Sequence, residues 1–326
     1  MSRIRKIAAL GIAASLAVGA MTGCQKKEEQ VIIYSNADEE AKLAMQTTLD
    51  ANGYSGKYLF QSFGTSELGG KLMAEGKNIE ADVVTMSTYY LESAQAEQSM
   101  FTDLDFDYKP LAEKRSFYAP FALMEGAIIV NTEVLAANSL SMPVSLKDLA
   151  KPEYKGMISV VDVMGSSTAW LMVQAIISEY GEEEAKTILK SVYENAGAHL
   201  ETSGSGPIKK VRAGEVAIGF GLRHQAVADK LKGLPIDYVD PTEGNYSLQE
   251  GLAVIDKGGK TNPLAKEMVK CLIEKVRPEI QKTYPGAVYE GEQVTGEYKS
   301  AYPKVFGEPL TVELLKKHQE LSEGCK

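Results

Sequence analysis

Short apolar runs alternate along the chain with longer segments of helical periodicity. The first three runs are Val31–Tyr34, Tyr58–Phe63 and Ala81–Met86, and the first two lead through small polar residues into helical patterns. Strands that alternate with helices are typical of a mainly parallel α/β sheet. The pattern therefore predicts a βαβαβ unit at the start of the folded part of the chain.

A second block of alternating strands and helices lies between two longer apolar segments, 119–131 and 249–255. Its expected strands are 157–161 and 216–220, and its expected helices are 167–180, 183–195, 207–213 and 224–232. This order favours one α/β block inserted into another and joined to it by two extended crossings.

Such an arrangement predicts two α/β lobes with a cleft between them. We expect residues 31–123 and about 249–275 in the first lobe, and residues 124–248 and about 276–326 in the second. A chain of this length can bury two cores.

The first thirty residues follow a different pattern. A basic start is followed by an apolar run from 7 to 20, which is shorter than the roughly 20 residues that span a bilayer. Small residues then lead to Cys24 and a charged stretch. This resembles the signal peptide of a bacterial lipoprotein, which implies removal of residues 1–23, lipid on Cys24, and a tether over 24–30 at the membrane. An ordinary secretion signal with an incidental cysteine is the alternative.

The net charge narrows the choice of partners. It is −9 for the whole chain, and loss of the three cations in residues 1–23 makes it −12. An acidic body argues against nucleic acid and against a broad anionic membrane surface as partners. After residue 23, no stretch reaches the apolar length of a membrane span.

Two cysteines remain if Cys24 carries lipid. A disulfide between Cys271 and Cys325 fits an oxidising compartment, but Cys271 falls in the helical pattern 264–276 and we favour a simply buried thiol. The sequence has no CxxC motif and no Cys/His cluster. We therefore expect no structural zinc site.

Three clusters combine glycine with hydroxyl side chains: Gly64–Ser66, Gly165–Thr168 and Ser203–Gly206. Each precedes a helical pattern, where free backbone N–H groups and the positive end of the helix dipole face outward. Any one cluster also fits plain helix capping, because Ser and Thr are preferred caps. Three together favour a bound anion such as a phosphate or phosphonate.

A basic pair, Arg223 and His224, follows the expected strand 216–220. Arg223 can hold a tetrahedral oxyanion with two parallel hydrogen bonds, and His224 can donate as well. The alternative is a solvent-facing arginine and a histidine satisfied at the start of a helix. In an otherwise acidic chain the pair favours ligand contact.

The order and spacing of several segments resemble the extracellular solute-binding proteins of ABC importers. These segments are 31–40, Ser62–Leu68, Ala81–Val84, Gly165–Thr168 and Gly214–Gly219, and the resemblance covers essentially the whole mature chain. It is nearest to the branch of ferric-iron-binding and 2-aminoethylphosphonate-binding proteins. It implies a type II periplasmic-binding-protein fold, whose two lobes close about a hinge and deliver a ligand to an ABC permease. We expect a monomer.

The iron branch implies adjacent tyrosines after the strand at 216–220 and a glutamate after the third strand, often with a histidine in the first loop. In this chain the corresponding places hold Arg223, Ser87 and Asn36. A hard trivalent ion needs anionic oxygen ligands, so these differences argue against iron. We expect neither a metal nor a cofactor.

The resemblance then implies a phosphonate or organophosphate ligand held by both lobes. The implied ligand-binding residues are Asn36, Thr65, Ser66, Ser87, Ser166, Ser167, Thr168, Ser205, Gly206, Arg223 and His224. For the amine of an aminophosphonate, the candidates are Asp38, Glu243 and Glu250, with Tyr118 or Tyr246 as a cation–π face.

Other function classes stay open at this point. Hydroxyl clusters and a histidine can form a nucleophilic site, but Gly165–Ala169 departs from GxSxG at its last position and the histidines are dispersed. We therefore expect no enzyme, and keep an envelope hydrolase acting on a phosphoester as an alternative beside ferric-iron binding. A purely structural lipoprotein would need no cleft.

Overall fold

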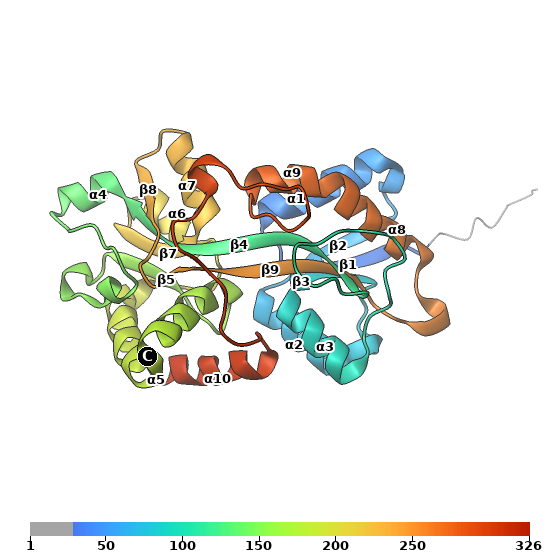
Figure 1. The fold of residues 1–326 in the computed structure, drawn as a ribbon, viewed down its shortest axis with the longest axis horizontal. Coiled ribbons are helices and arrows are strands. Elements are labelled where there is room, and N and C mark those ends of the chain that lie inside the picture. The colour runs from blue at the N-terminus through green and yellow to red at the C-terminus, as the bar shows by residue number, and fades with distance from the viewer. Residues whose placement is uncertain (1–28) are drawn as a thin grey trace, which may run out of the picture.

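The computed structural model describes residues 29–326, which form two α/β lobes (Figure 1). The expected signal peptide, Cys24 and most of the expected tether lie outside these residues. In residues 29–326 no helix combines the length and apolar character that a membrane span requires.

The first lobe is built on parallel strands and the helices that follow them: β1 (Val31–Ser35), α1 (Glu39–Leu49), β2 (Tyr58–Ser62), α2 (Thr65–Glu75), β3 (Val83–Ser87) and α3 (Thr88–Gln98). Strand β1 pairs with β2 on one side and with β3 on the other. The helices lie on both faces of the sheet (Figure 1). The predicted βαβαβ unit is confirmed.

The second lobe repeats this plan: α4 (Thr132–Ala137), β5 (Ile158–Val161), α5 (Ser167–Ala196), β6 (Leu200–Glu201), α6 (Gly206–Arg212), β7 (Ile218–Leu222), α7 (Arg223–Leu231) and β8 (Ile236–Val239). Strand β5 is parallel to both β6 and β7. Helix α5 breaks at Gly181, whose φ of 75° lies in the left-handed region. This break confirms the two helices expected on either side of it.

Two long strands, β4 (Tyr118–Asn131) and β9 (Asn245–Val254), connect the lobes. They pair antiparallel, with Tyr118 opposite Ala253 and Glu125 opposite Ser247, and run side by side from one lobe to the other (Figure 1). They are also antiparallel to their neighbours β3 and β7. A mainly parallel sheet is therefore confirmed within each lobe but is wrong for these hinge strands.

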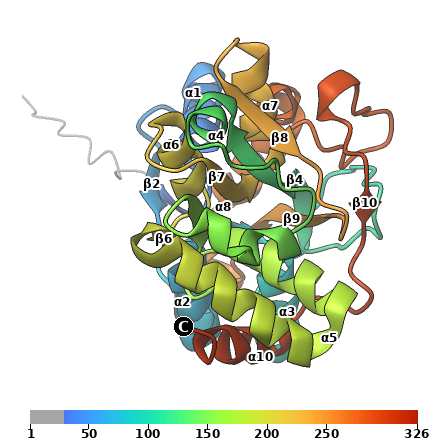
Figure 2. The same cartoon turned by 90° about the vertical axis from the view of Figure 1, so that its left-hand side faces the viewer.

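The C-terminal elements contact both lobes: α8 (Pro263–Cys271), α9 (Arg277–Thr283), β10 (Pro303–Lys304) and α10 (Val312–Glu323). Helix α10 packs against α5 and also contacts α3 (Figure 2). Ile280 and Tyr284 lie in the core that Val31 and Ile33 form. Helix α9 thus packs with the first lobe, although we expected the chain after residue 275 in the second, because its apolar face is buried against α1.

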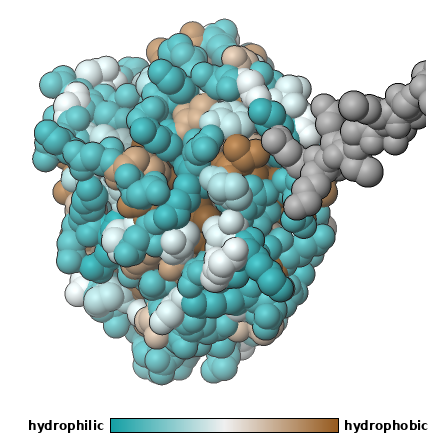
Figure 3. Space-filling model, turned by 90° about the vertical axis from the view of Figure 1, so that its right-hand side faces the viewer, coloured by the Kyte–Doolittle hydropathy of each residue, from teal (hydrophilic) through white to brown (hydrophobic). Residues whose placement is uncertain are grey.

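The end of the molecule formed by the first lobe carries mainly hydrophilic side chains (Figure 3). Cys271 and Cys325 are free thiols, partly buried and buried respectively, and they belong to different apolar clusters. The structure therefore does not pair them.

Candidate ligand-binding site

A cavity of about 520 Å³ lies between the lobes, and we call it the cleft. The loops after β1 and β2 line it from the first lobe, and the loops after β5 and β6 line it from the second. Within each lobe the strands are parallel, so their carboxyl ends meet at one edge of the sheet. This topology brings loops that are far apart in sequence to a single site.

The three hydroxyl clusters meet at the cleft. A Cβ placed on Gly204 would lie 2.3 Å from Thr168 Oγ1 and 3.2 Å from Ser166 Oγ, so the two second-lobe turns are in contact. A Cβ on Gly64 would lie 3.8 Å from the carbonyl oxygen of Gly165, which places the first-lobe turn directly opposite. The convergence gives one region rich in N–H and O–H donors.

Most of the hydroxyl groups expected at the ligand line the cleft: Thr65, Ser166, Ser167, Thr168 and Ser205. Ser166 is the N-cap of α5, and its hydroxyl oxygen accepts from Thr168 N at 3.3 Å. Ser66 is the second residue of α2 and Gly206 is the first residue of α6, and neither lines the cleft.

Two cations of α6, Lys209 and Arg212, also line the cleft, and the sequence analysis missed both. Arg212 donates to Asp229 from Nη2 at 3.1 Å, whereas Lys209 forms no ion pair among the described residues. The sequence pattern could have indicated them, because a helix that starts at Gly206, directly after the third hydroxyl cluster, has both basic residues within its first two turns.

A buried carboxyl lies on the opposite side of the cleft. Glu250 on β9 is 6% exposed, and its Oε1 accepts from Ser87 Oγ at 2.5 Å. Burial raises the pKa of this carboxyl to about 7, and the hydrogen bonds from Ser87 and Asn36 oppose that rise. Ser87 itself does not line the cleft, so it supports Glu250 rather than facing the ligand.

Asp38 and Tyr284 close the same side. Asp38 Oδ1 caps α1 by accepting from Ala41 N at 3.3 Å, and it also accepts a hydrogen bond from the hydroxyl of Tyr284. Burial, and then the charge of Asp38, raise the pKa of Tyr284, so its hydroxyl stays protonated. Both groups are already committed to contacts within the protein.

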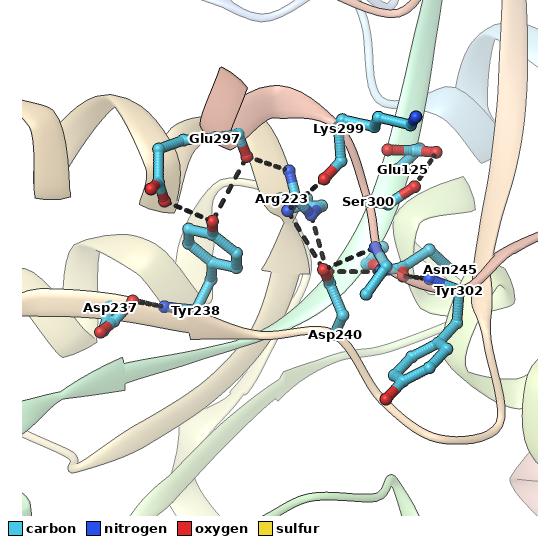
Figure 4. A network of polar contacts seen from close by, with 12 residues as sticks. Glu125, Arg223, Asp237, Tyr238, Asp240, Asn245, Glu297, Lys299, Ser300 and Tyr302 are labelled. Atoms are coloured by element: carbon cyan, nitrogen blue, oxygen red, sulfur yellow. Dashed lines mark hydrogen bonds and ion pairs between the residues drawn. The ribbon is translucent and has the colours of Figure 1, made fainter. Parts of the chain in front are cut away.

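Arg223 does not reach the cleft, which corrects the expectation that it grips the ligand. It is 3% exposed, and it donates to Asp240 from Nε at 2.6 Å and from Nη2 at 3.1 Å. It also donates to the carbonyl oxygens of Glu297 at 2.8 Å and Lys299 at 3.2 Å (Figure 4). These contacts bind α7 and β8 to the C-terminal segment, and they use the guanidinium donors that an oxyanion would need.

His224 does not supply charge to the ligand either. Its ring lies 4.4 Å from the ring of Tyr284, and it lines a separate cavity of about 180 Å³ together with Glu125 and Lys299. Burial lowers the pKa of His224 to about 3, so the imidazole is neutral at physiological pH. The expectation of a cationic histidine is therefore wrong.

The other amine candidates are placed by structural contacts. Glu243 is buried and accepts from the backbone N–H groups of Leu146 and Lys147 at 2.9 and 3.0 Å. Tyr246 stacks on Phe306, and Tyr118 packs in the core. Of the three acidic candidates for the amine, Asp38 and Glu250 line the cleft, and the expected ligand residue Asn36 lines it as well.

The chain is similar to known proteins over most of its length. A Haemophilus influenzae protein of uncharacterized function is 26% identical over 291 residues, covering 85% of this chain and 83% of its own. The spermidine/putrescine-binding periplasmic protein of Escherichia coli is 26% identical over 243 residues, covering 69% of this chain and 67% of its own. The Fe(3+)-binding periplasmic protein of Serratia marcescens is 27% identical over 237 residues, covering 71% of this chain and 68% of its own.

Solved structures share the fold. A periplasmic binding protein of Actinobacillus pleuropneumoniae, bound to fructose-6-phosphate, superposes with a TM-score of 0.68 at 22% identity and covers 91% of this chain and 96% of its own. An iron-bound protein of Pseudomonas aeruginosa superposes with a TM-score of 0.70 at 20% identity, covering 91% of this chain and 99% of its own. These likenesses establish the type II periplasmic-binding-protein fold. Residues 79–284, more than half of the chain, match the sequence pattern of one family, and the chain belongs to the bacterial extracellular solute-binding proteins.

Proposed function

We propose that the chain captures a small solute bearing a phosphonate or phosphate group in the cleft and delivers it to the permease of an ABC importer. Proteins of this family bind small ligands for import and are transport components rather than enzymes. The observation that carries the proposal is the meeting of three Gly-Ser/Thr turns at one point of the cleft.

The oxyanion is assigned to the second-lobe turns and the first-lobe turn opposite them. Ser166, Ser167, Thr168 and Ser205 offer hydroxyl donors there, and the N-terminus of the long helix α5 adds backbone N–H groups. Lys209 at the exposed rim adds one cation without an internal partner among the described residues. Hydrogen bonds to a charged group contribute about 1.5–3 kcal/mol each, so loss of one donor should weaken binding by about tenfold or more.

Ferric iron is the second candidate, because iron-binding proteins are among the similar proteins. The cleft offers Asp38, Glu250 and Tyr284 as oxygen ligands. Tyr284 and Asp38 bond to each other, however, and burial favours the protonated form of Glu250, so binding a trivalent ion would require these groups to reorganise. The donor-rich turns offer N–H and O–H groups, which suit an anion and not a cation. These points favour the oxyanion.

The proposal is tested by calorimetric titration with ethylphosphonate. Thr168→Val keeps the side-chain shape and removes the hydroxyl, and Thr187→Val is the matched control at an exposed position of the same helix. We expect Thr168→Val to weaken binding by about tenfold and the control to bind like the parent protein. Failure of the parent protein to bind any phosphonate or phosphate, with tight binding of iron(III), would replace the proposal by the iron alternative.

We also propose that lipid on Cys24 holds the protein at the outer face of the cytoplasmic membrane. The support is the sequence pattern described above, together with membership of a family of extracellular proteins. Expression of the full chain with Cys24→Ser tests this. The variant should move from the membrane fraction to the soluble fraction, and equal membrane association of variant and parent would contradict the proposal.

A further inference from the structure

The arginines of residues 29–326 differ in how many of their N–H donors the protein itself uses. Arg223 and Arg277 are buried, and each donates from Nε, from Nη1 and twice from Nη2. Arg115 is half-exposed but does not line the cleft. Arg212 does line the cleft, and its side chain is 38% exposed. Arg212 is therefore the described arginine that a solute in the cleft can reach.

Arg212 uses only one side of its guanidinium within the protein. Its Nη2 donates to Asp229 Oδ1 at 3.1 Å, and its Nε donates to Asp229 Oδ2. A guanidinium has five N–H donors, so this contact leaves both donors of Nη1 and one of Nη2 without a partner among the described residues. One free N–H on each terminal nitrogen points in the same direction. We call these two groups the free fork, and such a pair fits two oxygens of a tetrahedral anion.

Asp229 holds the guanidinium in a fixed position. It lies on α7, its side chain is 3% exposed, and among residues 29–326 its carboxylate accepts from Arg212 alone. A buried carboxylate without a charged partner is costly, so rotation of Arg212 away from Asp229 is unfavourable. The pair thus orients the free fork before any ligand arrives, which reduces the entropy lost on binding.

Lys209 serves as a comparison on the same helix. It lies three residues before Arg212, so the two side chains share one face of α6, and both line the cleft. Lys209 forms no ion pair among the described residues, and a lysine carries its charge on a flexible stem. Lys209 therefore attracts an anion without fixing its orientation, whereas Arg212 can do both.

We propose that the free fork of Arg212 binds the phosphonate or phosphate group beside the second-lobe turns, and that Asp229 is a positioning residue that acts through Arg212. This inference rests on the proposed function, because it names a further contact of the same ligand group. It also explains why one arginine can bind the ligand and another cannot. Arg223 is paired with Asp240 in the same way, but carbonyl oxygens already accept from its remaining side.

The first test is calorimetric titration with ethylphosphonate. Arg212→Gln removes the fork and the charge, and we expect it to weaken binding by about tenfold or more. Arg212→Lys keeps the charge without the fork and should recover only part of the lost affinity. Arg115→Gln removes the same charge outside the cleft, so this control should bind like the parent protein.

A double-mutant cycle tests the role of Asp229. Asp229→Asn should weaken binding in the parent protein, because the guanidinium loses its charged partner, but should cost nothing further in Arg212→Gln. A purely structural Asp229 would cost the same affinity in both backgrounds, and that result would overturn the positioning role. The double variant also leaves no buried carboxylate unpaired. If thermal unfolding shows that Arg212→Gln does not fold, the double variant must itself bind about tenfold or more weakly than the parent.

The remaining outcomes separate this inference from the proposed function. If the parent protein binds ethylphosphonate and Arg212→Gln binds it equally well, the free fork is not at the ligand, although the proposed function stands. Full recovery of affinity in Arg212→Lys overturns the fork in favour of charge alone. If the parent protein binds neither ethylphosphonate nor inorganic phosphate, the proposed function fails, and the role of Arg212 fails with it.

Discussion

At the scale of single residues, the structure separates groups that face the ligand from groups that hold the protein together. Arg223 has the chemistry of an oxyanion ligand, yet Asp240 and two backbone carbonyls surround its guanidinium. His224 has the chemistry of a charged donor, yet it is buried and neutral against Tyr284. Burial, rather than residue type, decides the role of both.

Arg223→Ala should destabilise the fold. The substitution leaves the Asp240 carboxylate, whose side chain is 9% exposed, without its charged partner, which costs about 3–5 kcal/mol of unfolding free energy. Urea denaturation measures the loss. Arg115→Ala, which breaks a half-exposed pair with Glu92, is the control and should cost less than about 1 kcal/mol. A stable Arg223→Ala protein with lost phosphonate affinity would instead return Arg223 to the site.

The stability of the protein should depend on pH through His224. Its pKa is lowered to about 3 in the folded protein from 6.5, so between these values the unfolded chain binds the additional proton. The contribution of neutral His224 to the free energy of unfolding is fully present above about pH 6.5 and is lost as the pH falls towards 3. Relative to His224→Phe, the parent should lose on the order of a few kcal/mol over this range in acid titrations of urea denaturation. Parallel curves for the two proteins would contradict the buried, neutral histidine.

At the scale of elements, the site depends on two turns that touch. The turn before α5 and the turn before α6 approach closely because Gly204 has no Cβ. Each turn alone would be a capped helix start, and their contact concentrates the donors. The first-lobe turn at Gly64 then meets them across the cleft.

Gly204→Ala should separate these turns. Its Cβ would lie 2.3 Å from Thr168 Oγ1, so the second-lobe donors must shift, and we expect affinity for ethylphosphonate to fall by about tenfold or more in a calorimetric titration. Gly307→Ala, where no atom lies within 4 Å of the new Cβ, serves as control and should bind normally. Undiminished affinity in Gly204→Ala would show that the oxyanion binds elsewhere.

The sequence was most informative where local pattern determines structure. The strands β1, β2, β3, β5 and β7, the break near Gly181 and the three hydroxyl turns follow from apolar periodicity and turn residues, whereas the short strands β6 and β8 were not predicted. The partners of Arg223 lie on the loop after β8 and in residues 297–299, and no local pattern links them. The same holds for Gln225 and Glu250, which only the fold brings to one cavity. Contacts between residues that are far apart in the sequence could therefore not be predicted from local patterns.

At the scale of the whole molecule, the two lobes and the hinge strands create a cleft with walls of opposite character. The second lobe contributes hydroxyl donors and cations, and the first lobe and hinge contribute carboxylates. The buried network around Arg223 and the packing of α10 against α5 and α3 lie outside the cleft. The molecule thus separates what holds the lobes together from what contacts a solute.

The central claim is that the cleft binds a phosphonate or phosphate group through the turns at Thr65, Thr168 and Ser205. Phosphorus-31 NMR of 2-aminoethylphosphonate with the purified protein tests it most directly. We expect a bound resonance, shifted from that of the free compound, which weakens in Thr168→Val and persists in Thr187→Val. An unshifted resonance at millimolar protein, or a bound resonance that Thr168→Val leaves unchanged, would show that these turns do not hold the ligand.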